Sequence, residues 1–171
     1  MSAGPENGPV EVDPTLPEVV QRFLRSGAQL ESIRLDAHGH WWHRGGRFEN
    51  RRVIDLFSRS VDRTDGGTWV VVVGRFTYPI AVDDTPFFVR SFTVEGEGPR
   101  ERVLLELVGG DVEPLEVDSL TYDGELGISC SVRGGRLRAR FLQAAYYALT
   151  QRLEEDADGY GLRLAGRLVR L

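Results

Sequence analysis

A short basic motif occurs twice in this chain, and its surroundings constrain the fold more than any other feature. Residues 44–51 read Arg-Gly-Gly-Arg-Phe-Glu-Asn-Arg and residues 133–140 read Arg-Gly-Gly-Arg-Leu-Arg-Ala-Arg, so five of the eight positions are identical. In a chain so rich in arginine and glycine, one such match is expected about once by chance. The order of the elements is stronger evidence, because both halves read strand, glycine turn, strand, Arg-Gly-Gly-Arg turn, helix, turn and strand. The sequence therefore predicts one αβ unit used twice.

Three helices and a larger number of short strands are predicted from the apolar spacing. Thr15 and Glu18 form the pattern of a capping box, with Thr15 as N-cap, for a helix that ends near Ser26. Asn50 is the expected N-cap of a second helix, and a third is expected over 137–155. Strands are expected at 33–36, 41–42, 69–73, 76–82, 87–94, 103–108, 120–122, 126–132, 160–164 and 168–171. The predicted fold class is α+β, with two similar units of short antiparallel strands plus one helix each, and an extra N-terminal helix.

The chain is expected to divide into a leader and two units. Residues 1–13 are rich in Gly, Pro and acidic side chains, a composition typical of a flexible leader. The glycine pair at 109–110 marks the predicted boundary, so that residues 14–110 form the N-terminal unit with its leading helix and 111–171 the C-terminal unit. Met1–Pro17 lacks the layout of a signal peptide, and no apolar run approaches the roughly 20 residues that span a bilayer. We therefore expect a cytoplasmic protein without a membrane partner.

The composition excludes several classes of protein. All 21 basic residues are arginine, which excludes Schiff-base chemistry, a P-loop and a protein kinase, because each needs a lysine amine. The net charge of -5 argues against a nucleic-acid polymer as partner, since such binding depends on phosphate neutralisation. Cys130 is the single cysteine, so the chain can form neither an internal disulfide nor a multi-cysteine zinc site.

Four stretches of the sequence resemble a known bacterial family. They are Gly39-His40-Trp41-Trp42-His43-Arg44-Gly45-Gly46, residues 53–59 (Val-Ile-Asp-Leu-Phe-Ser-Arg), residues 82–87 (Val-Asp-Asp-Thr-Pro-Phe), and residues 132–140, which are followed by Tyr146-Tyr147. On these motifs the chain resembles the uncharacterised domain of unknown function 1285 (DUF1285) family from about Ile33 to its C-terminus. The resemblance implies a duplicated α+β fold, a pleckstrin-homology-like C-terminal part and a site between the halves for a nucleotide-like ligand in signal transduction. The chain departs from the family pattern at Gly74–Thr77 and Phe92–Glu95.

The arginines around the repeated motif are the predicted ligand site. Cations at a helix N-terminus oppose the helix dipole, so two helices that begin among arginines favour a bound anion there. We predict that Arg44, Arg47, Arg133 and Arg136 hold a small anionic or nucleotide-like ligand, and that Trp41 or Tyr147 stacks on it. The alternative is that acidic neighbours pair with these arginines, or that they are solvated. The neighbours considered are Glu95, Glu97, Glu101 and Asp111.

Other groups with catalytic or metal-binding potential have simpler interpretations. His38, His40 and His43 occupy a predicted turn, and even on a strand His43 would face away from the other two, so no metal site is expected. Asp83 and Asp84 precede Thr-Pro and are interpreted as turn residues rather than a catalytic pair. No motif supplies a nucleophile or a dinucleotide fingerprint, so no cofactor is expected.

These observations favour a non-enzymatic binding or regulatory protein over an enzyme. The leading hypothesis places a small anionic ligand between the two units. A second hypothesis is a protein-interaction module that uses a sheet edge, with another protein as partner. A small hydrolase or transferase ranks last, because no nucleophile and base can be paired.

Overall fold

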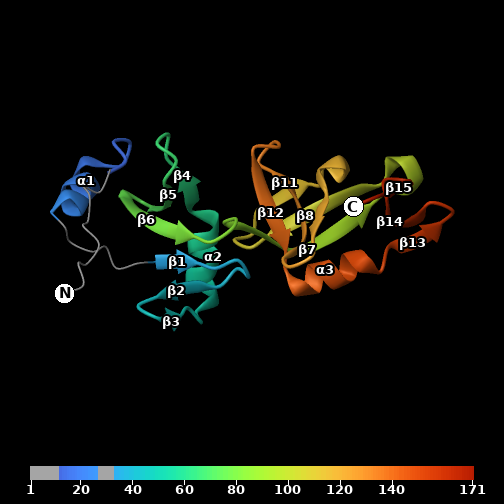
Figure 1. The fold of residues 1–171 in the computed structure, drawn as a ribbon, viewed down its shortest axis with the longest axis horizontal. Helices are drawn as coiled ribbons and strands as arrows, with labels where there is room; N and C mark the ends of the chain where they lie inside the picture. Colours follow the sequence, from blue (N-terminus) through green and yellow to red (C-terminus); the bar gives the residue numbers. More distant parts are fainter. Residues whose placement is uncertain (1–11, 27–32) are drawn as a thin grey trace, which may run out of the picture.

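The computed structural model describes residues 12–26 and 33–171 and has an α+β architecture. Within these residues two six-stranded sheets follow one another along the long axis of the molecule, and a small three-stranded sheet lies at the C-terminal end (Figure 1). None of the described helices is long and apolar enough to cross a membrane. The predicted leader lies outside the described residues except for its last two positions.

The first sheet contains the strands between residues 33 and 82, in the order β3-β2-β1-β6-β5-β4. Its first and last strands in sequence lie side by side and run parallel, with Ile33 opposite Ile80, and the other pairs are antiparallel. Helix α2 connects its two groups of three strands. The elements are β1 (Ile33–Leu35), β2 (Trp41–His43), β3 (Gly46–Arg47), α2 (Arg51–Arg59), β4 (Val61–Arg63), β5 (Trp69–Val73) and β6 (Phe76–Val82).

The second sheet repeats this topology in the order β10-β11-β12-β7-β8-β9. Again the first and last strands are parallel neighbours at the centre, with Ala139 opposite Phe87, and the short η2 stands where α2 stands in the first sheet. The elements are β7 (Phe87–Glu95), η1 (Gly98–Arg100), β8 (Arg102–Leu107), β9 (Val112–Pro114), η2 (Val117–Ser119), β10 (Thr121–Asp123), β11 (Gly127–Val132) and β12 (Leu137–Phe141). The shared strand order is consistent with a duplicated unit, although the central parallel pairs differ from the predicted antiparallel arrangement.

The two Arg-Gly-Gly-Arg motifs do not occupy equivalent places in the two sheets. The first motif forms the β2–β3 turn, and its structural counterpart is the Gly109-Gly110 turn between β8 and β9. The second motif forms the β11–β12 turn, whose counterpart is Gly74-Arg75 between β5 and β6. The motif recurs because both hairpins place an arginine and the next glycine at positive φ, which tight hairpins require.

The helix predicted over residues 137–155 is wrong at both of its ends. Residues 137–141 form strand β12, residues 153–155 belong to a further strand, and the helix between them is only α3 (Gln143–Thr150), so the second motif is not the entrance to a helix. Ala139 and Phe141 are buried in the sheet core, and β12 pairs on both sides with β11 and β7, which satisfies its backbone. The first motif does precede a helix, and Asn50 is its N-cap as predicted, because its side chain accepts hydrogen bonds from the N–H groups of Arg52 and Val53.

Apolar residues form one core in each sheet, and the two cores meet at a common junction. Phe88 of β7 packs into the first core with Leu142, and Gly39 of the first sheet lies directly against both side chains. On another side of the junction, Gly109 in the β8–β9 turn lies against the backbone of Arg59 at the end of α2. The predicted boundary at residues 109–111 therefore lies within the second sheet, and the chain crosses between the sheets at residues 83–86.

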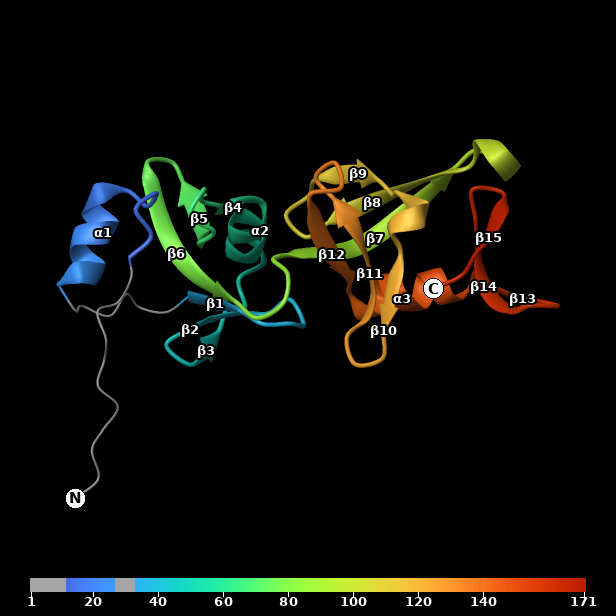
Figure 2. The ribbon, with the colours of Figure 1, turned by 45° about the horizontal axis from the view of Figure 1, so that its top comes forward.

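The second core is completed by the C-terminal elements. Helix α3 buries Ala145 and Leu149 against the second sheet, beside β7 (Figures 1 and 2). Strands β13 (Leu153–Asp156), β14 (Gly159–Leu164) and β15 (Arg167–Val169) form the third sheet. Leu162 and Leu164 of β14 are fully buried in the same core, so the third sheet packs on the second unit.

A hydrogen-bonded cluster attaches the N-terminal segment to the β4–β5 hairpin. The Asp13 carboxylate accepts hydrogen bonds from the hydroxyls of Thr15, Thr64 and Thr68 at 2.5–2.6 Å. The Thr15 hydroxyl in turn accepts from the N–H of Gly66 at 2.9 Å, so Thr15 is not the N-cap that its spacing predicts. Helix α1 (Glu18–Arg25) begins three residues later, and Glu18 pairs with Arg22.

We expect this cluster to make stability depend on pH. Hydrogen bonds from Thr15, Thr64 and Thr68 hold the pKa of the Asp13 carboxyl well below its usual value. A lowered folded-state pKa stabilises the fold above the unfolded pKa, and this contribution is lost as the pH falls through the folded pKa. Asp13→Ala should therefore lower the urea midpoint at pH 7, and its difference from wild type should shrink below about pH 4.

Asp65→Ala is the matched control for this prediction. Asp65 lies in the same hairpin turn, and no hydrogen bond to its side chain occurs in the described part of the chain. Its replacement should leave the urea midpoint unchanged at both pH values. Equal midpoints for Asp13→Ala and Asp65→Ala at pH 7 would show that the cluster does not stabilise the fold.

Candidate functional site

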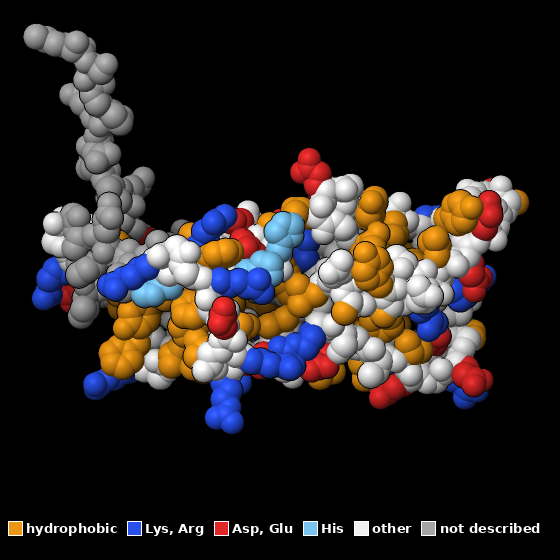
Figure 3. Space-filling model, turned by 90° about the horizontal axis from the view of Figure 1, so that it is seen from below, with side chains coloured by type: hydrophobic (Ala, Val, Ile, Leu, Met, Phe, Trp, Pro, Cys, Tyr) orange, Lys and Arg blue, Asp and Glu red, His pale blue; other side chains and the backbone are white. Residues whose placement is uncertain are grey.

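Two hollows lie where the two sheets meet. The first, called the arginine cleft, has a volume of about 510 Å³ and is lined mainly by polar side chains. The second, called the aromatic cavity, has a volume of about 650 Å³. Both draw residues from each sheet, and Figure 3 shows histidine and arginine side chains on one face around the middle of the molecule.

Four arginines from both sheets line the arginine cleft. Arg59 is the last residue of α2 and Arg63 lies on β4, whereas Arg133 and Arg136 belong to the β11–β12 turn. The cleft is completed by Val61, Asp62, Phe87, Asp111 and Leu137. Four guanidinium groups and two carboxylates therefore line it, and the excess positive charge favours an anion.

These four arginines differ in how many hydrogen bonds and ion pairs their guanidinium groups already make with other protein groups. Arg133 donates to Asp111 at 2.6 Å, pairs with Glu113 at 3.1 Å and lies over the Phe87 ring at 5.2 Å. Arg63 donates to the Gly67 carbonyl at 3.1 Å, and Arg136 donates through Nε to the Arg133 carbonyl at 3.0 Å.

Arg59, Arg63 and Arg136 all lack a carboxylate partner among the described residues, but Arg63 also lies over the Trp69 ring at 5.2 Å. Arg59 and Arg136 are therefore the two cations of the cleft that are most available to a ligand. Among the described residues neither has a carboxylate partner, and both are exposed. They belong to different sheets, so a ligand that touches both would bridge the two units.

The structure brings together only two of the six residues predicted as a ligand site. Arg133 and Arg136 line the arginine cleft, whereas Arg44 and Arg47 lie on the β2–β3 hairpin and line neither hollow. Trp41 is 1% exposed, and its ring lies in the first core with Nε1 donating to the Ser58 hydroxyl at 3.1 Å.

The ring of Trp41 is therefore closed to a ligand in this conformation. Tyr147 is exposed on α3 beside Tyr146, but it also lines neither hollow. Of the acidic neighbours considered, Asp111 pairs with Arg133, whereas Glu101 pairs with Arg152 instead.

Sequence reasoning did not assign Arg59 and Arg63 to the site. Both lie in the first sheet's unit, and only the packing of the two sheets brings them to Arg133 and Arg136. Their one local signal is the position of Arg59 in the last turn of α2, where a cation is favourable for the helix itself.

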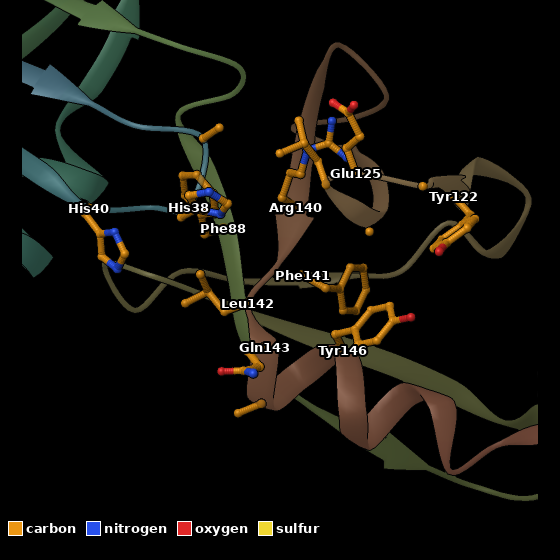
Figure 4. A pocket seen from close by; sticks show the side chains of 15 residues that line it. His38, His40, Phe88, Tyr122, Glu125, Arg140, Phe141, Leu142, Gln143 and Tyr146 are labelled. Carbon is orange, nitrogen blue, oxygen red and sulfur yellow. The ribbon is translucent and has the colours of Figure 1, made fainter.

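The aromatic cavity combines an apolar wall with a buried cation (Figure 4). Arg140 of β12 and Phe88 of β7 are direct neighbours in the parallel pair, so their side chains share one face of the sheet. The β1–β2 turn lies beside Phe88 and contributes His38 and His40, and the β10–β11 turn contributes Glu125. The remaining side chains include Tyr122, Phe141, Leu142, Gln143, Ala144 and Tyr146.

The histidines form a turn around Asp36 rather than a cluster. The Asp36 carboxylate accepts hydrogen bonds from the N–H groups of His38 and His40, each at 2.9 Å, and from Trp42 Nε1 at 2.8 Å. Burial would raise the pKa of Asp36, but these donors outweigh it and the net direction is downward. His43 stacks on Phe48, away from the other two histidines.

The fold is shared with two solved proteins of the DUF1285 family. The protein from Silicibacter pomeroyi DSS-3 has a TM-score of 0.62 and 23% identity, over 82% of this chain and 79% of that chain. The protein from Shewanella baltica OS155 has a TM-score of 0.53 and 15% identity, over 71% of this chain and 92% of that one. No family model and no curated protein matches the chain. The resemblance to DUF1285 proteins predicted from the motifs is thus confirmed at the level of the fold.

Proposed function

We propose that this chain is a cytoplasmic, non-enzymatic binding protein whose arginine cleft accepts a small phosphate-bearing or nucleotide-like anion. The observation that carries the proposal is that Arg59 and Arg136, from different sheets, face one cleft without carboxylate partners among the described residues. Guanidinium groups donate paired hydrogen bonds to phosphate oxygens, and such charge-assisted bonds are stronger than neutral ones. An anion would also relieve the mutual repulsion of the four arginines.

The position of the cleft supports a regulatory role. A ligand held by Arg59 and Arg136 contacts the end of α2 on one unit and the β11–β12 turn on the other. Such a ligand stabilises one arrangement of the two sheets by the amount of its differential binding. We therefore propose a role in signal transduction, in which anion binding changes the relative arrangement of the two sheets.

A protein partner is the second candidate. Tyr122 lies on β10, an edge strand of the second sheet, and is exposed together with Leu153 and Tyr160 around a small groove of about 260 Å³. An exposed strand edge beside apolar side chains can add a strand from another protein. The predicted pleckstrin-homology-like character of the C-terminal unit would fit this use.

The experiment for the anion proposal is a thermal-shift and calorimetric titration with inorganic phosphate, AMP and ATP. We expect at least one of these compounds to raise the melting temperature, because a ligand that binds only the folded state stabilises it. Arg59→Ala and Arg136→Ala should each weaken its binding by about 10-fold or more, the usual value of a charge-assisted hydrogen bond.

Arg100→Ala is the matched control, since it removes an exposed arginine from η1, away from the cleft. It should leave binding unchanged. A protein that binds none of the three compounds, or whose Arg136→Ala variant binds like Arg100→Ala, would refute the proposal. A partner protein whose binding is lost on Tyr122→Asp but kept in both arginine variants would favour the second candidate.

A further inference from the structure

Arg140 is a buried cation that lines the aromatic cavity and not the arginine cleft. Arg140 is 3% exposed, and its Nε donates to the Asp84 carboxylate at 2.5 Å. Its Nη1 is buried and has no hydrogen-bond partner within the described part of the chain. A buried guanidinium N–H without an acceptor is unfavourable, so this atom favours any acceptor that the cavity can admit.

The rest of the wall defines what else such a ligand must contain. Phe88 and Leu142 supply apolar surface, and Phe141, Tyr122 and Tyr146 add three further rings (Figure 4). A volume of about 650 Å³ lies within the range of about 300–1,000 Å³ that accommodates small organic ligands. The cavity therefore matches a molecule with an apolar or aromatic body and an anionic end.

The charges around the cavity restrict that anionic end to a single charge. The Asp84 carboxylate already faces Arg140, where it is shared with Arg138, and Glu125 lines the cavity itself. A doubly charged phosphate would be repelled by Glu125, whereas one carboxylate needs only the free side of Arg140. We therefore expect the Arg140 site to bind anions more weakly and more selectively than the arginine cleft does.

We infer that the aromatic cavity binds a small aromatic or aliphatic monocarboxylate, whose carboxylate accepts a hydrogen bond from Arg140 Nη1. The body of the ligand packs between Phe88 and Leu142 on one side and Tyr146 of α3 on the other. This site is separate from the arginine cleft and does not depend on the anion proposed for it.

The test uses phenylacetate as the probe, with phenylacetamide as its neutral isostere and phenyl phosphate as the more highly charged analogue. Binding is measured by ligand-observed NMR and calorimetry at up to millimolar concentration. We expect phenylacetate to bind at least about 10-fold more tightly than either analogue, because only it matches one guanidinium N–H without repulsion from Glu125. Glu125→Gln should tighten phenylacetate binding several-fold. It should also reduce the difference in affinity between phenylacetate and phenyl phosphate.

Two variants on α3 test the location of the site without altering Arg140. Ala144 lines the cavity and Ala148 does not, although both are exposed on the same helix. Ala144→Trp should abolish phenylacetate binding by filling the cavity, whereas Ala148→Trp should leave it unchanged. Arg140→Gln should also abolish binding, and the α3 pair decides the question if that variant does not fold.

The inference is overturned if phenylacetate does not bind at millimolar concentration, if it binds no better than phenylacetamide, or if Ala144→Trp retains binding. Binding of phosphate or nucleotides in the arginine cleft should survive Ala144→Trp. Loss of phenylacetate binding in Arg136→Ala, with no effect of Ala144→Trp, would assign the probe to the arginine cleft and refute a second site.

Discussion

Asp84→Asn is expected to lower the free energy of unfolding by roughly 3–5 kcal/mol, the usual cost of removing one partner from a buried ion pair. The Asp84 side chain is 12% exposed and accepts hydrogen bonds from Arg138 and from Arg140, whose own side chain is 4% exposed. Asparagine keeps the shape but leaves the Arg140 guanidinium buried without a counter-charge. Urea unfolding followed by far-UV circular dichroism measures the loss.

The neighbouring residue provides the control. Asp83 also pairs with an arginine, Arg34, but the side chains of this pair are 31% and 53% exposed. Water and salt screen such a pair, so Asp83→Asn should leave the urea midpoint almost unchanged. Equal losses in the two variants would show that Arg140 does not depend on Asp84 as its counter-charge.

Gly109→Ala has the second largest expected effect, a loss of about 2–3 kcal/mol. Gly109 has φ +109°, which an alanine adopts only with strain, and an added Cβ would lie 2.8 Å from the backbone N of Arg59. The β8–β9 turn would have to move away from α2, so the junction between the two sheets would loosen. The loss is measured by urea unfolding, with nucleotide binding as a second measurement because Arg59 lines the arginine cleft.

Gly110→Ala separates backbone strain from the contact with α2. Gly110 has φ +98°, but a Cβ added there would have no other atom within 4 Å beyond its own chain neighbours. It should therefore lose only the part of the stability that comes from the positive φ, and it should bind ligand like wild type. A Gly110→Ala variant as unstable as Gly109→Ala would mean that the turn does not press on α2.

The predictions for Asp84 and Gly109 both concern the junction between the two sheets. Asp84 holds the connection between the sheets to β12, and Gly109 lets the second sheet approach the helix of the first. A further ion pair, between Arg90 of β7 and Asp55 of α2, crosses the junction as well. The relative position of the two sheets therefore rests on ion pairs and close backbone contact in addition to the apolar packing of Phe88.

Local features of this protein could be predicted from its sequence. Asn50 caps α2 through its own side chain, and the glycine pairs lie in turns because those positions need positive φ. Both depend on residues within a few positions of each other, so neighbouring sequence is sufficient to specify them. The same holds for most strands, whose apolar patterns match the observed ranges closely.

Residues 137–155 show where local information was insufficient. Leu137, Phe141 and Ala145 recur at helical spacing, but Leu137, Ala139 and Phe141 also recur at strand spacing. The strand prevails over the first five residues because β11 and β7 lie on either side and pair with it. β11 is joined to these residues by a short turn, but β7 lies far earlier in the chain, so the periodicity alone could not decide between the two.

The sequence by itself determined the turns, helix α2 with its Asn50 cap, most strands and the likeness to the DUF1285 fold. Only the tertiary structure decided that the repeated motif occupies non-equivalent turns, and that the first and last strands of each sheet pair in parallel. It also decided which arginines share a cleft and that Arg140 lies buried beside Phe88. The physical reason is that these outcomes depend on pairing between strands about 50 residues apart, and short sequence patterns specify conformation without specifying partners.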